Sequence, residues 1–305
     1  MALADCTLEE LISPRGYACS CGRIHRVALH SLKIGQGAVA GLPEALRAIG
    51  CKHPFVVFDR NTEIAAMSPV RAALDGAGFT YTEYRIPLER VEPDEHTVGS
   101  MCMAFNPACD GLVAVGSGVI NDCCKVLAHT LGKPQAVVAT APSMDGYASN
   151  SSSMIRDGVK VSLYNACPGA IIADTSILRF APQRMLQAGL GDMLAKSIAL
   201  CEWRISHLVT QEYYCGEIAG LMRESLRKIV AAAPRLQTRA PEAVEAVVEG
   251  LILSGVAMAF AEVSRPASGL EHYFSHLWEM AALAGKRQSE LHGIQVGVGT
   301  MLTLR

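Results

Sequence analysis

The sequence predicts an α/β domain with a Rossmann-like parallel sheet, followed by an all-helical domain. In the first half of the chain, short apolar runs of strand length alternate with segments of helical spacing, which is the pattern of βαβ units. From Pro182 onward almost every segment has helical character instead. The run Gly111–Val115 is apolar throughout, which is typical of a parallel strand buried on both faces.

Several segments of the first half have the length and composition of strands. They are Arg26–Ser31, His53–Phe58, Phe79–Arg85, Gly111–Val115, Gln135–Ala139 and Ala170–Ala173. Between them, apolar residues recur at helical spacing in Ala38–Ile49, Glu63–Ala77, Thr97–Asn106 and Val119–Leu131. Ser, Gly and Asn dominate Ser143–Ser153, so we expect a long loop there, followed by a small hairpin through Val159–Leu163.

The change of pattern places a domain boundary near residue 180. We expect a dinucleotide-binding α/β domain over residues 1–180 and a helical metal- and substrate-binding domain over residues 181–305. Helix breaks are expected near Pro234, Pro241 and Ser264–Gly269. Because the chain stops at Arg305 in mid-pattern, without a polar closing segment, we expect the helical domain to be truncated at its C-terminal end.

The composition excludes several classes of protein. Half of the 305 residues are apolar and 18% are charged, a balance that disordered chains do not have. The formal net charge is -2, so no basic excess indicates a nucleic-acid partner. The uncharged runs Gly250–Ala261 and Leu291–Leu304 are shorter than the ~20 residues of a membrane helix. The acidic N-terminal segment does not resemble a signal peptide. We therefore expect a cytoplasmic protein without membrane insertion.

The chain contains 11 cysteines, an odd number in a chain long enough to build its own core, so reduced thiols are expected. One segment, Cys19–His25, groups Cys19, Cys21 and His25, which are metal-binding residue types. Its C-x-C-x3-H spacing is not a standard zinc spacing, and no second cysteine pair follows nearby. Buried reduced thiols are the favoured interpretation, and a structural metal is the alternative.

Gly116-Ser117-Gly118 follows the most apolar strand and opens a helix. Glycines allow a phosphate to approach the backbone closely, and a helix N-terminus favours an anion. The pattern G-x-G-x-x-G is incomplete, because Asn121 occupies the third glycine position, so a simple strand-to-helix turn is an alternative. Asp59, at the end of another strand, is a candidate for a ribose contact or a surface-turn residue.

The helical half contains a candidate metal site. His272 and His276 are four residues apart, so they share one face of a helix, and His292 follows in the sequence Leu-His-Gly. Asp192 comes after Gly189 and Gly191, at an apparent helix start. Asp and His ligands suit a divalent metal with an open position for substrate, although unrelated surface or core residues would give the same pattern.

With these motifs the sequence resembles the sn-glycerol-1-phosphate dehydrogenases, in the superfamily of iron-containing alcohol dehydrogenases, glycerol dehydrogenase and dehydroquinate synthase. The resemblance rests on GSGVIND, TAPSMDGYAS, GLGDMLAK, SGLEHYFSH and LHG, in the family's order between residues 116 and 293. TAPSMDGYAS, residues 140–149, is the most specific of these motifs. The resemblance implies a dehydroquinate synthase-like fold, an NAD or NADP cofactor and one divalent metal, with zinc favoured over nickel or iron.

The resemblance also implies roles for individual residues. Asp192, His272 and His292 would bind the metal, His276 and Asp145 would contact substrate, and Lys160 would serve the substrate phosphate. Asp59 would lie at the adenosine end of the cofactor. The residues implied to line the rest of the cofactor are Gly116, Ser117, Gly118, Val119, Ile120, Asn121, Asp122, Thr140, Ala141, Pro142, Ser143 and Ser149.

We therefore expect a metal-dependent oxidoreductase that reduces dihydroxyacetone phosphate to sn-glycerol 1-phosphate with NADH or NADPH. The metal would act as a Lewis acid on the carbonyl, and His276 or a water would supply the proton. A homo-oligomer, plausibly a dimer, is expected. The alternatives are a glycerol dehydrogenase on the same scaffold, a dehydroquinate synthase-like lyase, and an inactive truncated remnant.

Overall fold

The computed structural model describes residues 2–304, which form two compact units. One unit consists of residues 28–141 and 150–181. The other consists of residues up to 27, residues 142–149 and residues from 182 onward. We call them the sheet unit and the helical unit. The loop around Asp145 therefore belongs to the helical unit, although it interrupts the sheet unit in the sequence.

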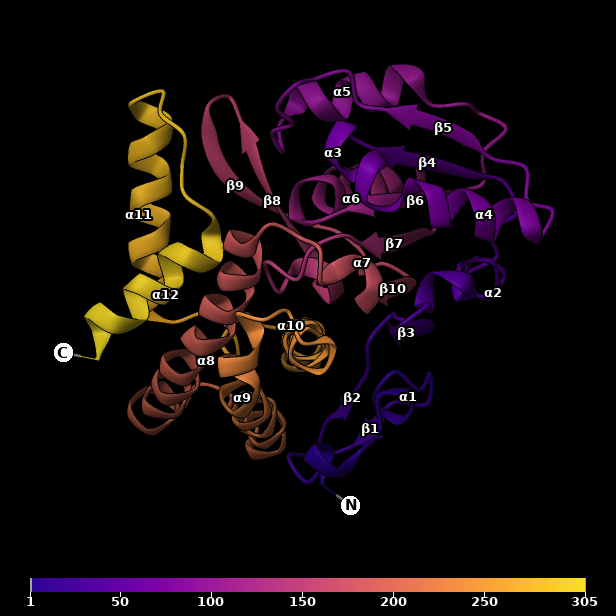
Figure 1. Cartoon of the computed structure of the whole chain (residues 1–305). Helices are drawn as coiled ribbons and strands as arrows, with labels where there is room; N and C mark the ends of the chain where they lie inside the picture. The colour runs from indigo at the N-terminus through magenta and orange to yellow at the C-terminus, as the bar shows by residue number, and fades with distance from the viewer. Residues whose placement is uncertain (1, 305) are drawn as a thin grey trace. The chain divides into compact units, whose positions relative to one another are not determined.

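The sheet unit is built on a parallel sheet (Figure 1). In spatial order, its strands within the described residues are β3 (Ser31–Gly35), β10 (Ala170–Asp174), β7 (Gln135–Ala139), β6 (Gly111–Gly116), β4 (Pro54–Phe58) and β5 (Thr82–Arg85). Strands β4, β6, β7 and β10 are buried along their whole length, as expected for parallel strands covered on both faces. The predicted parallel α/β fold is confirmed.

The helices of this unit cover the sheet with apolar side chains. They are η2 (Ala38–Gly41), α2 (Leu42–Ala48), α3 (Arg60–Thr62), the π-helical η3 (Glu63–Met67), α4 (Ser68–Gly76), α5 (Glu95–Ala104), α6 (Gly118–Leu131) and α7 (Thr175–Leu178). On one face, Leu42, Leu46 and Leu74 pack against alternate strand residues such as Val56 and Val113. An antiparallel hairpin, β8 (Ser151–Arg156) and β9 (Val159–Tyr164), completes the unit.

Two local expectations are wrong here. The first strand is Ser31–Gly35, not Arg26–Ser31, because backbone pairing with Ala170–Asp174 begins only at Ser31. Lys33 lies inside that edge strand and weakens its apolar pattern. The hairpin predicted through Val159–Leu163 exists, but its first strand begins at Ser151, within the segment expected to be loop. Pairing with β9 overrides the low strand propensity of the serines.

The helical unit is confirmed as predominantly helical. Its elements are η1 (Leu3–Asp5), α1 (Leu8–Leu11), the short strands β1 (Tyr17–Ala18) and β2 (Ile24–His25), η4 (Gly146–Ala148), α8 (Gln183–Thr210), α9 (Gly216–Leu236), α10 (Pro241–Ala261), α11 (Leu270–Ala284) and α12 (His292–Thr303). Asp192 lies inside α8, not at a helix start, because the glycines before it are accommodated within that helix.

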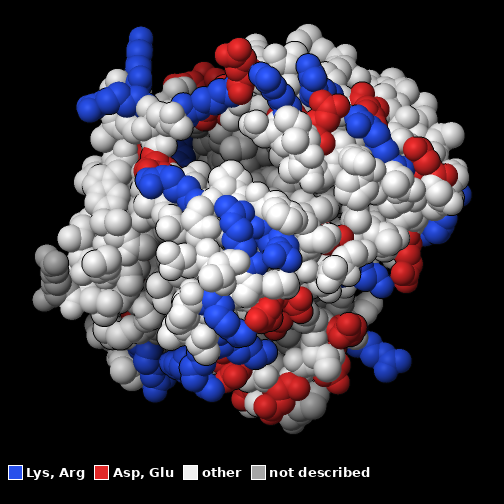
Figure 2. Space-filling view, viewed as in Figure 1, with Lys and Arg blue, Asp and Glu red and all other residues white. Residues whose placement is uncertain are grey.

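Helix α10 is long and apolar enough to cross a membrane by length and composition, although 72% of its most apolar window is buried. The uncharged run Gly250–Ala261, which we expected to be too short for a membrane helix, is only the second half of this 21-residue helix. Helix α10 packs against α8, α9 and η4 and is the core helix of its unit. On the face drawn in Figure 2, basic and acidic side chains are interspersed, in keeping with the net charge of -2.

Candidate active site

Close backbone contacts fix the site in the helical unit. A Cβ on Gly189 would lie 1.9 Å from the carbonyl oxygen of Pro142, and one on Gly293 would lie 1.9 Å from that of Ala188. A Cβ on Gly191 would lie 2.3 Å from the Gly293 oxygen. Only glycine allows such approach, so the loop at Pro142, helix α8 and the start of α12 meet backbone to backbone. These contacts explain the two glycines, Gly189 and Gly191, that precede Asp192.

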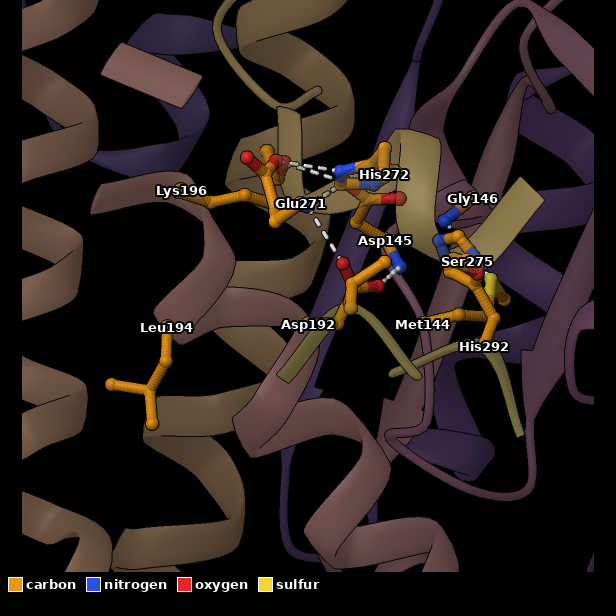
Figure 3. Close-up of polar contacts among 12 residues, drawn as sticks. Met144, Asp145, Gly146, Asp192, Leu194, Lys196, Glu271, His272, Ser275 and His292 are labelled. Carbon is orange, nitrogen blue, oxygen red and sulfur yellow. Dashed lines mark hydrogen bonds and ion pairs between the residues drawn. The ribbon is translucent and has the colours of Figure 1, made fainter. Parts of the chain in front are cut away.

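Three charged side chains meet beside these contacts, as Figure 3 shows. The Nζ of Lys196 lies 2.7 Å from Asp192 Oδ1 and 2.7 Å from Asp145 Oδ2. The second Asp192 oxygen accepts a hydrogen bond from the Asp145 backbone N–H at 3.0 Å. Ser254 on α10 donates its hydroxyl to Asp145 Oδ2 at 2.8 Å. The loop motif around Asp145 is therefore tied to helices α8 and α10.

This network changes the titration of its members. Burial alone would raise the pKa of Asp145, but the positive charge of Lys196 and the hydrogen bonds from Lys196 and Ser254 lower that pKa to about 2. Burial acts in the opposite direction on Lys196, and the two carboxylates outweigh it, so the Lys196 pKa is raised. The ammonium and the Asp145 carboxylate are therefore both charged at neutral pH.

His272 lies at the start of α11 and is 7% exposed. Its Nδ1 lies 2.7 Å from Glu271 Oε1, and the same oxygen accepts the Gly269 backbone N–H at 2.8 Å. Burial, together with the charges of Lys196 and His292, lowers the pKa of His272 well below its ordinary value. A neutral imidazole whose Nδ1 faces a carboxylate presents its Nε2 lone pair outward, which is the usual arrangement of a metal-binding histidine.

His292 is the first residue of α12, and its Nδ1 lies 3.2 Å from the hydroxyl of Ser275. Ser275 in turn donates to Gln295 Oε1 at 2.8 Å. The rings of His292 and His272 have centroids 5.2 Å apart. Asp192, His272 and His292 each offer one ligand atom, and these atoms lie within 4.8 Å of one another. The buried carboxylate and two oriented imidazoles fit a divalent first-row metal.

His276 lies one helical turn after His272 and is more exposed. Its ring centroid lies 6.3 Å from that of His272, and its Nδ1 is 3.6 Å from Glu279 Oε2. Both histidines line a pocket of about 310 Å³ together with Ser264, Arg265, Ser268 and Tyr273. Arg265 is held by Glu212, which accepts its Nε–H at 2.9 Å. The pocket therefore combines one buried and one accessible imidazole with a guanidinium.

The predicted phosphate loop lies in the sheet unit, at the carboxyl end of β6. A Cβ on Gly116 would lie 2.6 Å from that of Ile120, which explains the need for glycine there. Strand β6 pairs with β4, and Asp59 directly follows β4. After β4 the chain continues to β5 on one side of the sheet, and after β6 it continues to β7 on the other side. The carboxyl ends of β4 and β6 therefore form the topological switch point, where doubly wound sheets bind their ligands.

The other residues predicted to bind the cofactor either join the segments at Gly116 and Thr140 or hold the fold with their side chains. Thr140 donates its backbone N–H to the Gly116 carbonyl at 3.2 Å, and Ser117 donates its hydroxyl to Ala141 O at 3.4 Å, so these segments adjoin. The Asn121 side chain accepts from Gln135, and the Asp122 carboxylate accepts from the Ser153 backbone and pairs with Lys125. Both side chains therefore hold the fold, and Val119 and Gly118 open helix α6.

Asp59 accepts the Thr62 backbone N–H at 2.7 Å and thereby caps α3. Pro142, Ser143 and Ser149 belong to the helical unit, where Ser149 donates to the Gly146 carbonyl at 3.2 Å. Lys160 lies on β9 of the sheet unit, opposite Ile155. It is therefore not in the same unit as Asp145 and the histidines.

Sequence reasoning missed several residues of this site. Lys196 lies four residues after Asp192, a helical spacing that could have revealed the ion pair. Glu271 directly precedes His272, and its role as the partner of Nδ1 has no sequence signal of its own. Arg265 can be recognised as a site residue only from the pocket that it lines in the structure.

Comparison with known proteins places these features in a family. The profile of the family described as iron-containing alcohol dehydrogenase matches residues 33–182. A glycerol-1-phosphate dehydrogenase [NAD(P)+] of Halalkalibacterium halodurans is 36% identical over 93% of this chain and 72% of its own length. The protein of that name from Hyperthermus butylicus is 33% identical over 92% of this chain and 79% of its own length.

Solved structures share the fold at lower identity. Glycerol dehydrogenase from Schizosaccharomyces pombe has a TM-score of 0.74 at 20% identity, over 92% of this chain and 72% of its own. An iron-containing alcohol dehydrogenase from Thermotoga maritima has a TM-score of 0.71 at 15% identity, over 92% and 77%. The fold and the sequence relatives agree, and this chain belongs to the glycerol-1-phosphate dehydrogenase family of the iron-containing alcohol dehydrogenases.

Proposed function

We propose that this chain reduces dihydroxyacetone phosphate to sn-glycerol 1-phosphate with NADH or NADPH, at a divalent metal held by Asp192, His272 and His292. The observation that carries the proposal is the convergence of these ligands in a family whose relatives are named for this activity. We favour zinc, because it accepts one carboxylate and two imidazoles and leaves a position open. Bound there, the metal would supply Lewis acidity to the ketone of the substrate.

The surrounding side chains would prepare the ligands. Glu271 holds the His272 ring so that Nε2 is available, and the buried, neutral state of His272 favours metal binding over protonation. Lys196 is a positioning residue, because it joins the Asp192 and Asp145 carboxylates. Asp145, charged at neutral pH, would accept a hydrogen bond from a substrate hydroxyl.

His276 is our candidate for the proton donor. It lines the same pocket as His272, and 46% of its side chain is exposed, so it can exchange protons with solvent. An imidazole is suited to that role near neutral pH. The Glu279 carboxylate, 3.6 Å from its Nδ1, would orient the ring.

We propose the same pocket for the substrate phosphate. Arg265 and the hydroxyls of Ser264 and Ser268 line it beside the two histidines. A guanidinium already fixed at Nε by Glu212 keeps further N–H donors for phosphate oxygens. The sequence resemblance gave this role to Lys160 on β9, which remains the alternative assignment.

The cofactor would bind at the switch point of the sheet unit. The glycine turn at Gly116 and the N-terminus of α6 offer backbone N–H groups to the pyrophosphate. Asp59 would face the ribose, because the hydrogen bond from the Thr62 backbone N–H to Asp59 Oδ1 fixes the orientation of its carboxylate. Thr140, Ala141 and Pro142 continue from the adjoining strand β7 and would line the nicotinamide side, with Ser143 and Ser149 following in the motif.

The test is the loss of NADH and NADPH absorbance with dihydroxyacetone phosphate, before and after metal removal and zinc return. Dihydroxyacetone is the control substrate, and a product that sn-glycerol-3-phosphate dehydrogenase does not oxidise identifies the 1-phosphate isomer. Equal turnover of dihydroxyacetone would favour a glycerol dehydrogenase instead. Absence of turnover in folded, zinc-loaded protein would contradict the proposal.

We further propose a cytoplasmic homo-oligomer. None of the 11 cysteines is paired in a disulfide, in keeping with a reducing compartment. Exposed apolar side chains of α8, such as Ile205, Leu208 and Val209, would be covered by a second copy. Size-exclusion chromatography with light scattering tests this assembly, and a monomer at micromolar concentration would contradict it.

A further inference from the structure

Four metal-binding side chains, none of which belongs to the proposed active site, meet in the helical unit. They are Cys19, Cys21, His25 and Cys215, each of which offers a ligand atom within 4.8 Å of the others. Cys19, Cys21 and His25 come from the β1–β2 hairpin at the start of the chain, and Cys215 immediately precedes α9. We propose that these four side chains bind a structural zinc ion.

The distances between the ligand atoms match a tetrahedral zinc site. Zinc bonds of about 2.3 Å to sulfur and about 2.0 Å to nitrogen, at tetrahedral angles, place two sulfurs about 3.8 Å apart and a sulfur and a nitrogen about 3.5 Å apart. The Sγ atoms of Cys19 and Cys215 are 3.6 Å apart. Nε2 of His25 lies 3.5 Å from Cys21 Sγ and 3.6 Å from Cys215 Sγ. A disulfide would bring two sulfurs to about 2.0 Å.

The orientation of His25 supports the same interpretation. Its Nδ1 lies 3.0 Å from the carbonyl oxygen of Phe260. Because a carbonyl only accepts, Nδ1 carries the proton, and Nε2 directs its lone pair at the sulfur atoms. The ring stacks on that of Phe260, with centroids 5.5 Å apart, and His25 is only 1% exposed. A carbonyl behind a ligating imidazole is the usual outer support of a metal site.

The sulfur atoms have similar support. The Cys21 backbone N–H points at Cys19 Sγ at 3.5 Å, and the Tyr213 hydroxyl lies 3.4 Å from Cys21 Sγ. Arg23 stacks over the Tyr213 ring, 3.6 Å from its centroid, which brings a positive charge to a site where three thiolates exceed the charge of the zinc ion. On binding, the thiols release their protons to solvent, so no redox partner is needed.

Such a site would attach the N-terminal hairpin to the helices. Cys19 and Cys215 are 196 residues apart in sequence, so the zinc would close a long loop. It joins β1 and β2 to the start of α9 and, through Phe260, to the end of α10. Closed sets of four protein ligands, without an open position, are typical of structural zinc. The site shares no ligand with the catalytic metal proposed at Asp192.

The test uses the full chain, stripped of metal under reducing conditions and then loaded with Co²⁺ or Zn²⁺. We expect a thiolate-to-cobalt charge-transfer band in the wild type, because three of the four proposed ligands are cysteines. The band reports this site alone, since the Asp192 site contains no sulfur. Mass spectrometry for metals is expected to find two zinc ions per chain. Cys215→Ser and Cys19→Ser are each expected to lose the band and one zinc, and Cys201→Ser, at an exposed cysteine of α8, is expected to keep both.

His292→Ala separates this proposal from the proposed function. We expect it to lose one zinc and keep the thiolate band, since it affects only the Asp192 site. The wild-type spectrum needs no variant to fold and decides the main point. Cobalt loading without a thiolate band, or a Cys19–Cys215 disulfide in the fully folded protein under reducing conditions, would overturn the zinc site.

Discussion

Lys196 and Asp192 form a fully buried ion pair within one turn of α8, with Nζ and Oδ1 2.7 Å apart. The same ammonium reaches Asp145 in a loop 47 residues earlier than Asp192, so one positive charge holds two carboxylates from different parts of the chain. Without a bound cation, Lys196 is the group that balances their charge.

Replacing Lys196 with Met should therefore destabilise the metal-free protein. The change leaves two buried carboxylates without their partner, which costs about 3–5 kcal/mol. Urea unfolding in the presence of a chelator measures the loss. Lys228→Met removes a surface pair with Glu249 and should cost less than about 1 kcal/mol. Equal losses in the two variants would contradict the importance of the buried pair.

The low pKa of Asp145 gives a pH-dependent contribution to stability. Its folded value of about 2 lies below the ordinary 3.8, so the stabilisation is fully present above about pH 4 and is lost as the pH falls towards 2. That difference corresponds to about 2 kcal/mol. In metal-free protein, the stability gap between wild type and Asp145→Asn should narrow over this range. A gap that stays constant down to pH 2.5 would argue against the charged carboxylate.

His292 and His276 should respond differently to substitution by Ala. Loss of a metal ligand should weaken zinc binding by more than about 100-fold in His292→Ala. His276→Ala should keep its zinc and lose about 10²–10⁴-fold in kcat, the usual contribution of a positioned acid. Metal titration and steady-state kinetics with dihydroxyacetone phosphate distinguish the two. His129→Ala, on the exposed end of α6, is the control.

Gly293→Ala tests the backbone contact between α12 and α8. The new Cβ would lie 1.9 Å from the Ala188 carbonyl oxygen, so the helices must separate and carry His292 away from Asp192. We expect a loss of at least about 1–3 kcal/mol and weaker zinc binding. In α9, Gly220→Ala meets open space and should stabilise by about 0.5–1 kcal/mol. Unfolding and zinc titration are measured on both, and wild-type affinity in Gly293→Ala would refute the contact.

Arg265→Met tests the phosphate assignment. We expect KM for dihydroxyacetone phosphate to rise by about 10–100-fold, since a charge-assisted contact contributes about 1.5–3 kcal/mol. Turnover of dihydroxyacetone, which has no phosphate, should change little. Arg227→Met removes an exposed guanidinium of α9 and should leave both substrates unaffected. If Lys160→Met rather than Arg265→Met raises this KM, the phosphate assignment moves to the β8–β9 hairpin.

The strands were predictable where burial on both faces makes a sequence uniformly apolar, as in Gly111–Gly116. Strand β3 was not, since Lys33 breaks its pattern and its limits depend on pairing with a segment about 140 residues later. The proposed ligands Asp192, His272 and His292 could be named from sequence motifs, and the structure brings them together, whereas the pocket position of Arg265 depends on tertiary packing that leaves no local pattern. For the same reason, Cys215 could not be linked to Cys19 by spacing.

The division of the helical unit into three stretches of chain has a consequence for biosynthesis. The strands of the parallel sheet all lie between residues 31 and 174, so the sheet unit can fold while the ribosome is still translating α8. The N-terminal hairpin and the loop around Asp145 are made early, but their partners in α8 to α12 come last. Both early segments must therefore wait on the nascent chain, exposed to chaperones and proteases, until their partners Ser254 and Phe260 of α10 have been translated.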